Sequence, residues 1–352
     1  MFNELTKKLN QFIEMGIPGN DCIVYHNGKC VYRHFAGYSD KENKIEMTGK
    51  EFYNIYSCSK PITCVAALQL YEKGLFKLED KLSKYMPEFE TMSVQTDTGV
   101  KIAENSITIK DLFCMTTGYS YHSAPATEAC RKATDGRCPT REFMKYLAKM
   151  PLAFEPGTKW MYGLSHDILA ALVEVISGIR FGEYVKKNIF EPLSMNDSTF
   201  LLDDSEVDKL CAQYKGEKAE RIEKTILSFK FGTEYESGGA GCISTVEDYI
   251  KFLEGLRAGK LLKEETITLM STNQLNDNQL VDYWVDGYGY GLGVRCPKDE
   301  SKTDFGWGGA AGSYLFIDRD NGITAFYAQH FIESPVQSFR SEITPIIQKI
   351  IK

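Results

Sequence analysis

Near both ends of the chain, β-rich runs and short stretches of helical spacing follow one another closely. Between residues 3 and 15 apolar side chains recur every three or four positions, which predicts an amphipathic helix ended by Gly16. Two β-rich runs, 22–26 and 30–35, then flank Asn27-Gly28. Because Asn-Gly favours the tight turn of a hairpin, these runs predict the first two strands of a sheet.

The central part of the chain, from residue 57 to about 284, has mainly helical periodicity. One apolar helix is predicted from residue 57 to about 74, and another over residues 168–176. The capping-box patterns Thr108–Asp111 and Ser244–Glu247 each precede an apolar run, so each predicts the start of a further helix.

Strand-like segments return towards the C-terminal end. The runs 313–317 and 323–327 are separated by a second Asn-Gly pair, which again predicts a hairpin. A last helix is predicted from residue 334, with Phe339 on its buried face and a kink at Pro345.

Strands at both ends and helices between them predict an α+β fold. The simplest assembly is one antiparallel sheet built from both chain ends and covered by the terminal helices, with a mainly helical lobe inserted. We predict a single domain over residues 1–352, with a sheet lobe formed by 1–56 and 285–352 and a helical lobe formed by 57–284. Clefts between lobes are common binding sites, and residue 57 falls at this junction.

The composition is that of an average soluble globular protein, with 43% hydrophobic and 25% charged residues. A net charge of −7 without a long basic run argues against nucleic acid and anionic membranes as partners. No run approaches the roughly 18 apolar residues of a spanning helix and no signal-peptide core is seen, so we predict a cytoplasmic protein without membrane contact. The 10 Cys form no Cys-x-x-Cys pattern and the five His no His-Glu-x-x-His, which predicts free thiols and no metal site.

The segment 56–61 (Tyr-Ser-Cys-Ser-Lys-Pro) contains the only Ser-x-x-Lys pair in the 352 residues. Positions i and i+3 of a helix lie on one face, so the Ser57 hydroxyl and the Lys60 amine can meet. Pro61 fits only a first turn, which puts Ser57 at the helix N-terminus, where unpaired N–H groups stabilise an anion. The same residues also suit a plain helix start, with Ser as the cap and Lys as a surface charge. We interpret the neighbouring Cys58 as a small buried residue.

Five segments, taken in order, decide between these interpretations because together they resemble one family. It is the serine β-lactamase-like hydrolases, which comprise class C β-lactamases, low-molecular-mass D,D-peptidases and family VIII carboxylesterases. Each segment alone is loose, but the ordered set is specific, and the resemblance runs from about residue 21 to 348. The family's fold, a sheet flanked by helices plus a helical lobe, agrees with the architecture predicted above. The segments are 56–61, 112–119, 160–167, 236–248 and 305–312.

The resemblance implies that Ser57 is the nucleophile of an acyl-enzyme mechanism. Lys60, held against Ser57 and Tyr162, would help to remove the hydroxyl proton, and Tyr162 would protonate the leaving group. A free lysine, with a pKa of about 10.4, is protonated at neutral pH, so whether Lys60 or a Tyr162 phenolate takes the proton stays open.

The resemblance also implies an oxyanion hole formed by the backbone N–H groups of Ser57 and Ala310. Gly308 and Gly309 suit this place, because a substrate carbonyl must lie against bare backbone; a bulge at a sheet edge is the alternative. His122 falls where the family often places a polar residue of the pocket wall, although a surface histidine is the commoner case.

Two departures from the lactamase and peptidase pattern bear on substrate. Leu164 stands where those enzymes have the Asn of Tyr-x-Asn, and Trp307-Gly-Gly replaces Lys-Thr-Gly. Both polar groups that bind a lactam or D-peptide are thereby replaced by apolar ones, as in the family VIII esterases. Asp167 would either orient the loop or cap the following helix, of which we expect capping.

We therefore predict a cofactor-free serine hydrolase acting on a small-molecule ester or amide, most simply a carboxylesterase. A β-lactamase or D-amino-acid peptidase or amidase with relaxed recognition is one alternative, and a non-catalytic binding scaffold of the same fold is another. The sequence leaves the oligomeric state and the physiological substrate open.

Overall fold

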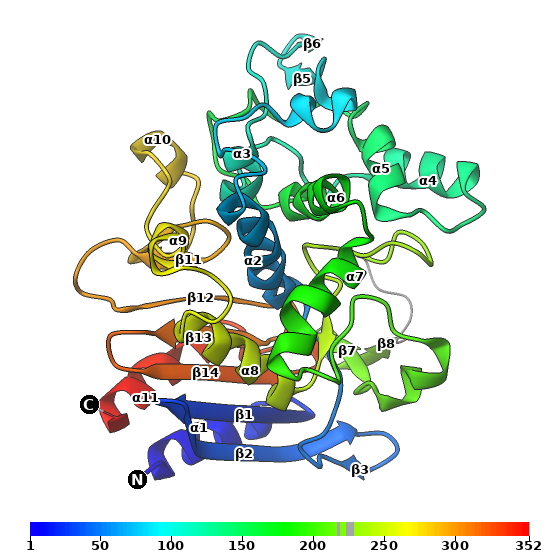
Figure 1. The fold of residues 1–352 in the computed structure, drawn as a ribbon. Coiled ribbons are helices and arrows are strands. Elements are labelled where there is room, and N and C mark those ends of the chain that lie inside the picture. The colour runs from blue at the N-terminus through cyan, green and yellow to red at the C-terminus, as the bar shows by residue number, and fades with distance from the viewer. Residues whose placement is uncertain (217–218, 223–228, 352) are drawn as a thin grey trace.

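In the computed structural model, which describes residues 1–216, 219–222 and 229–351, eight strands form one antiparallel sheet in the order β10-β11-β12-β13-β14-β1-β2-β3 (Figure 1). Its strands come from the two ends of the chain. They are β1 (Gly19–His26), β2 (Lys29–Asp40), β3 (Ile45–Glu46), β10 (Tyr288–Tyr290), β11 (Arg295–Pro297), β12 (Asp304–Gly308), β13 (Tyr314–Asp318) and β14 (Ile323–Gln329).

The N-terminal and C-terminal strands meet in the middle of this sheet. β1 pairs with β14 in antiparallel register from Asn20 opposite Gln329 to His26 opposite Ile323. The prediction of one sheet built from both chain ends is thus confirmed. The first hairpin is also confirmed, and the φ of 49° at Asn27 is of the kind that its tight turn requires.

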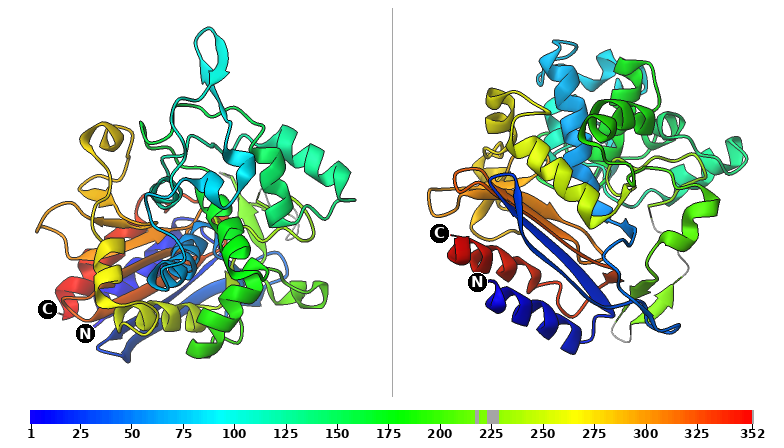
Figure 2. Two further views of the ribbon diagram at one scale, coloured as in Figure 1. Left: turned by 45° about the horizontal axis from the view of Figure 1, so that its top comes forward. Right: turned by 60° about the horizontal axis from the view of Figure 1, so that its bottom comes forward.

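Helices cover both faces of the sheet. The terminal helices α1 (Asn3–Glu14) and α11 (Ile343–Ile351) lie together on one face, and α8 (Val246–Arg257) lies on the other (Figure 2, right). Adjacent side chains of β14 point to opposite faces of the sheet. Tyr327 packs edge-on against a phenylalanine of α1, whereas Phe326 stacks on a tyrosine of α8 with ring centroids 4.2 Å apart.

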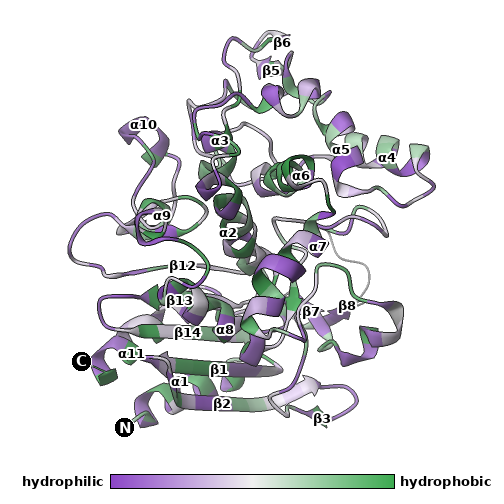
Figure 3. Ribbon diagram, in the orientation of Figure 1, coloured by the Kyte–Doolittle hydropathy of each residue, from purple (hydrophilic) through white to green (hydrophobic). Residues whose placement is uncertain are grey.

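The remaining helices form a second body beside the sheet, in which α2 and α6 pack against each other (Figures 1 and 3). Figure 3 shows that both carry mainly apolar residues, as expected for helices at the centre of a core. No helix of the described residues is long and apolar enough to cross a bilayer. The helices are α2 (Ser59–Glu72), α3 (Ile109–Cys114), α4 (Ala124–Ala133), α5 (Thr140–Leu147), α6 (Ser165–Ser177), α7 (Phe181–Val185), α9 (Glu264–Met270) and α10 (Asp277–Leu280).

Short strands complete the described chain. β4 pairs with β9, β5 pairs with β6, and β7 lies between β15 and β8. Their bounds are β4 (Tyr53–Asn54), β5 (Ser93–Thr96), β6 (Gly99–Ile102), β7 (Gln213–Lys215), β8 (Glu220–Ile222), β9 (Ile243–Ser244) and β15 (Phe331–Ile332). The division of the chain into two lobes at residues 56 and 285 stays a prediction.

One of the two predicted capping boxes is confirmed, and the other does not form. Thr108 and Asp111 exchange side chain–backbone hydrogen bonds at the start of α3. At the start of α8 the cap is Thr245, whose hydroxyl accepts the N–H of Asp248, so Ser244 was the wrong residue. Ser244 instead lies in β9, opposite Tyr53 of β4, which leaves the next residue to cap the helix.

The predicted start of the terminal helix, at residue 334, was wrong. The helical conformation begins with a 3₁₀ turn at Arg340–Glu342 and continues as α11 from Ile343. Pro345 therefore lies in the first turn of α11, where its missing N–H has no helical acceptor to lose, and no kink is required. Phe339, predicted to be buried, precedes the helix and is 39% exposed.

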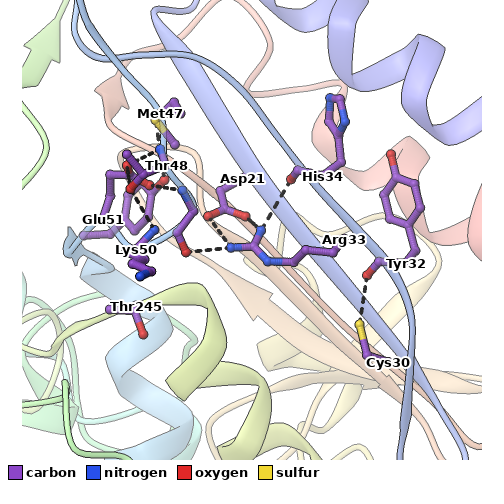
Figure 4. A network of polar contacts seen from close by, with 12 residues as sticks. Asp21, Cys30, Tyr32, Arg33, His34, Met47, Thr48, Lys50, Glu51 and Thr245 are labelled. Atoms are coloured by element: carbon purple, nitrogen blue, oxygen red, sulfur yellow. Dashed lines mark hydrogen bonds and ion pairs between the residues drawn. The ribbon is translucent and has the colours of Figure 1, made fainter.

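A buried polar network ties the sheet to the segment that leads into α2 (Figure 4). Arg33 of β2 forms an ion pair with the fully buried Asp21 of β1 and also donates to the Gly49 carbonyl at 2.8 Å. In the same turn, the Glu51 carboxylate accepts the backbone N–H and the hydroxyl of Thr48. These contacts fix the chain on the sheet a few residues before Ser57.

Candidate active site

Ser57 lies in a 3₁₀ turn (Tyr56–Cys58) that runs directly into α2. Pro61 is in the first turn of α2, as predicted. Tyr56, which precedes the serine, has a φ of 48°, a left-handed conformation that is rare for a bulky residue. Such strain is found where the surrounding structure holds a residue in a required position. Ser57 itself is 8% exposed.

Lys60 reaches back over the turn to the serine. Its amine donates to Ser57 Oγ at 3.1 Å, to the Gly239 carbonyl at 2.7 Å and to the Tyr121 hydroxyl at 3.2 Å. The side chain is completely buried, and among the described residues it forms no ion pair. The predicted contact between the Ser57 hydroxyl and the Lys60 amine is present, so Lys60 is not a surface charge.

Tyr162 approaches this pair with the face of its ring. The Lys60 amine lies 4.4 Å from the ring centroid, a cation–π contact. The Tyr162 hydroxyl accepts a hydrogen bond of 2.9 Å from the indole N–H of Trp307, and within the described residues it makes none to Ser57 or Lys60. The structure brings the three predicted side chains together, but Lys60 meets the ring of Tyr162 and not its hydroxyl.

Tyr121 is a site residue that the sequence reasoning missed. About half of its side chain is exposed, yet its hydroxyl contacts the Lys60 amine. Burial of the hydroxyl, with the nearby Tyr162 and Asp167, raises the pKa of Tyr121 well above its usual 10. His122, the predicted pocket residue, is exposed and its imidazole makes no hydrogen bond to any described residue, so its role stays a prediction.

Gly163 is a sequence signal that could have revealed Tyr121, because it marks a close contact between the loop carrying Tyr121 and the loop carrying Tyr162. A Cβ placed on Gly163 would lie 2.0 Å from the carbonyl oxygen of Tyr119, so only glycine allows the backbones to approach so closely. The Leu164 N–H then bonds that same carbonyl at 3.2 Å. This contact brings the loop carrying Tyr121 beside the loop carrying Tyr162.

The backbone donors predicted for an oxyanion hole are free. Within the described residues, the N–H groups of Ser57 and Ala310 donate to no acceptor. Ala310 is the exposed residue of an otherwise buried turn that follows β12. Ser313, at the end of the same turn, donates from its hydroxyl to the Ile55 carbonyl at 3.0 Å, which ties the turn to the chain two residues before the serine.

Gly308 and Gly309 are required for a reason that the sequence did not show. A Cβ on Gly309 would lie 2.1 Å from Ser313 Oγ and 2.4 Å from the Ile55 carbonyl oxygen, and one on Gly308 would lie 2.5 Å from the Arg340 guanidinium. Arg340 donates to the carbonyls of Gly309, at 2.6 Å, and Ser313, at 3.1 Å. Protein atoms therefore leave no room for a side chain at either glycine. Contact of Gly308 and Gly309 with a substrate stays a prediction.

Asp167 does not cap α6, so our expectation for it was wrong. The helix begins at Ser165, and the Asp167 carboxylate, 1% exposed, turns to another segment. It accepts hydrogen bonds from the hydroxyls of Tyr235 at 2.9 Å and Ser237 at 2.6 Å. Burial raises the pKa of this carboxyl, although these hydrogen bonds and the nearby Lys60 charge oppose the rise.

Two other titratable neighbours are unsuited to proton transfer at Ser57. Burial raises the pKa of the Cys58 thiol to about 11, and the thiol lies 3.3 Å from Ser313 Oγ, so Cys58 is the small buried residue that we expected. Burial and the Lys60 charge lower the pKa of His166 to about 3, which keeps its ring neutral. No group of three or more metal-binding side chains suited to a metal ion occurs in the described residues.

Aromatic rings surround Tyr162. Trp160 stacks on Tyr162, and Trp307 and Trp284 lie with ring centroids 5.6 Å and 5.4 Å from it. Trp284 is 60% exposed and packs edge-on over Trp160 at 4.5 Å. An apolar group bound beside the Tyr162 hydroxyl would therefore meet aromatic surface.

The geometry combines the parts of a covalent acyl-transfer site. An alcohol lies against an amine at the start of a buried helix, two unpaired backbone N–H groups are held nearby, and two phenols adjoin the amine. A nucleophile and a base within hydrogen-bond reach, with donors for a developing oxyanion, are the groups that such chemistry needs.

Comparisons with known proteins agree with this description. The family model described as Beta-lactamase matches residues 2–331. The chain is 26% identical to the esterase EstB of Burkholderia gladioli over 88% of this chain and 85% of that protein. It is 29% identical to the lovastatin esterase of Penicillium rubens over 76% of each.

A solved structure shares the fold. EstCE1, described as a hydrolase with promiscuous acyltransferase activity, superposes with a TM-score of 0.81 at 24% identity, over 97% of this chain and 98% of the other. The predicted β-lactamase-like fold and the resemblance to the serine β-lactamase-like hydrolases are therefore confirmed.

Proposed function

Because the chain belongs to the beta-lactamase family, we propose that it is a serine hydrolase that forms an acyl-enzyme on Ser57 and cleaves small carboxylic esters. The observation that carries this proposal is the 3.1 Å contact between the Lys60 amine and Ser57 Oγ at the buried start of α2. The relatives named as esterases support the ester over other acyl compounds.

In the proposed acylation step, Ser57 Oγ attacks the ester carbonyl carbon and its proton passes to the site base, so that a tetrahedral oxyanion forms. The N–H groups of Ser57 and Ala310 stabilise this oxyanion, an arrangement commonly worth about 3–4 kcal/mol per donor. The C–O bond to the alcohol then breaks, and a phenol donates the proton that the alcohol takes with it. Water later attacks the acyl-enzyme by the same steps in reverse order and releases the acid.

Hydrogen-bond directions favour Tyr162 as the donor to the leaving alcohol. An indole N–H is a donor only, so the Tyr162 oxygen must accept from Trp307 and its own proton is free for a substrate oxygen. The Tyr121 oxygen accepts from Lys60, which makes Tyr121 the partner of the amine. Lys60 can take the serine proton only when it is neutral, and the choice between Lys60 and a phenolate as base remains part of the proposal.

The surroundings of the site favour esters over lactams and D-peptides. Leu164, which replaces the amide-binding Asn, is 2% exposed, and Trp307 replaces the carboxylate-binding Lys. A site built to hydrogen-bond a group discriminates strongly for it, and these two positions offer an acyl compound no such partner.

The test uses the purified protein with a fluorophosphonate probe, p-nitrophenyl acetate, p-nitrophenyl butyrate and nitrocefin. We expect one probe adduct, on Ser57 by peptide mass spectrometry, hydrolysis of both esters, and nitrocefin turnover at least about 100-fold slower. Faster turnover of nitrocefin than of the esters would support a β-lactamase instead. A protein that forms no adduct with the probe and hydrolyses none of the three substrates would be the binding scaffold.

Replacing each tyrosine by phenylalanine separates their roles. Tyr162→Phe removes the proposed acid, so kcat for p-nitrophenyl butyrate should fall by about 10²–10⁴-fold, the usual contribution of a general acid. Tyr121→Phe removes one of three hydrogen bonds to Lys60, so a loss of about tenfold is expected. As a control, Trp307→Phe keeps an aromatic ring but loses the indole N–H that orients Tyr162, together with part of the ring system. A larger loss for Tyr121→Phe than for Tyr162→Phe would exchange the two assignments.

Gly309→Ala tests the turn that carries Ala310. The new methyl group would meet Ser313 and Ile55, so the turn must shift and unfolding should require about 1–3 kcal/mol less, as for other overpacked sites. We expect kcat to fall by about 10²-fold, because one oxyanion donor is misplaced. Gly136→Ala is the matched control, since a Cβ there meets nothing within 4 Å and only its φ of +81° is strained. It should lower the unfolding temperature and leave kcat unchanged.

A further inference from the structure

The proposed mechanism leaves one buried charge without a role. Asp167, in the first turn of α6, is 1% exposed and forms no ion pair with any described residue. A buried carboxylate costs several kcal/mol of solvation unless nearby groups compensate it. Within the described part of the chain, only the hydroxyls of Tyr235 and Ser237 contact it as side-chain donors.

Lys60 has the complementary problem, since its buried amine contacts no carboxylate of the described residues. Gly239 lies between the two groups. Its carbonyl accepts the Lys60 amine at 2.7 Å, and its backbone N–H stabilises the charged form of Asp167. A Cβ placed on Gly239 would lie 2.6 Å from Asp167 Oδ2 and 3.5 Å from the Lys60 nitrogen, so one bare residue separates carboxylate from amine.

The segment that carries Gly239 is built onto α2 at several points. Thr63 donates to the Gly238 carbonyl at 2.7 Å, and the Ser59 hydroxyl accepts the Cys242 N–H at 2.9 Å. Ser237 donates to Asp167 and accepts the Ala240 N–H at 3.0 Å. The carboxylate therefore holds the chain that in turn holds the amine.

The charged and titratable groups that interact with this carboxylate come from three elements. Lys60 comes from α2, Tyr121 from the loop before α4, and Tyr235 from the segment before Ser237. The adjacent residue of α6, His166, is neutral, because burial lowers its pKa to about 3. Asp167 is thus the negative charge that acts on Lys60 and Tyr121.

We propose that Asp167 is a positioning residue of the active site: it fixes Gly239 so that the Lys60 amine is held against Ser57, and its negative charge acts on the groups that move the serine proton. This rests on the proposed function, in which Ser57 and Lys60 carry out acyl transfer. Because a nearby negative charge favours the protonated form of a general base, Asp167 is expected to move activity towards higher pH.

The test is the pH dependence of kcat/KM for p-nitrophenyl butyrate in Asp167→Asn, which keeps the shape of the side chain and removes its charge. We expect kcat to fall about 10- to 100-fold and the acid limb of the profile to move to lower pH by about one unit or more, as when a neighbouring charge is removed. A merely structural role would lower kcat without moving the limb.

Two further variants complete the experiment. Ser237→Ala removes one of the hydrogen bonds that stabilise the charged carboxylate and so favours its neutral form. It should therefore move the acid limb in the same direction by less. It replaces Asp167→Asn as the test if that variant does not fold. Glu174→Gln neutralises another carboxylate of α6, which lies two turns further along the helix and accepts the N–H of Phe181 at the start of α7. This variant should change neither kcat nor the acid limb of the pH profile.

The inference is overturned if folded Asp167→Asn and Ser237→Ala both keep the wild-type acid limb. That result would leave the proposed function intact, because the wild-type protein would still hydrolyse the ester and label on Ser57. A wild-type protein without ester turnover would overturn the proposed function itself.

Discussion

Ser57→Ala is expected to lower kcat for p-nitrophenyl butyrate by at least about 10⁴-fold, because a nucleophile acting with its base as a unit contributes most of the rate enhancement. The same change should abolish the fluorophosphonate adduct. Only one oxygen atom is removed from a residue that is 8% exposed, so the unfolding temperature should stay close to that of the wild type. Rates at saturating ester and a thermal melt on the same preparation give both values.

Cys58→Ala is the matched control for this variant. It changes the adjacent residue, whose thiol is buried against Ser313, and kcat should stay within a few-fold of the wild type. If Ser57→Ala kept more than about one hundredth of the wild-type kcat, or if the adduct persisted, another residue would have to be the nucleophile.

Lys60→Met is expected to lower kcat by about 10³–10⁵-fold with little loss of stability. Methionine keeps the length and the apolar stem but removes the amine, so the serine loses the group proposed to move its proton. The Gly239 carbonyl and the Tyr121 hydroxyl lose a donor, which costs about 1–3 kcal/mol for a buried group. Removal of an unpaired buried amine offsets part of this loss.

The stability measurement distinguishes this result from simple unfolding. Lys73→Met, at the exposed C-terminal end of the same helix, should change neither kcat nor the melt. A Lys60→Met variant that retained a tenth or more of kcat would assign the serine proton to one of the tyrosines. A variant that lost activity only because it unfolded would show a large drop in melting temperature.

Local rules were sufficient for several features of the fold and the site. Asn27-Gly28 predicted its hairpin because two residues with positive φ are required there, and those residue types supply them. Ser57 and Lys60 were predicted to touch because three positions of one helix turn separate them, and Pro61 fixed where that helix begins. In each case the residues that interact are neighbours in the chain.

The errors lie where a side chain had a choice of distant partners. Asp167 is well placed to cap α6, yet its carboxylate turns to Tyr235 and Ser237, 68 and 70 residues away in the chain. Tyr121 was one aromatic residue among 20 tyrosines, and only the contact of two loops at Gly163 brings it to Lys60. No periodicity along the chain encodes such a meeting.

The sequence by itself determined most of the elements and the serine–lysine pair, because helix periodicity and turn chemistry act over a few residues. Strand patterns at both chain ends indicated the single sheet. Tertiary packing alone decided which tyrosine hydroxyl meets the Lys60 amine, that the Tyr162 hydroxyl contacts Trp307, and that the Asp167 carboxylate lies beside Gly239. The physical reason is that hydrogen-bond direction, burial and charge separation depend on the distance between segments in space, which no local pattern specifies.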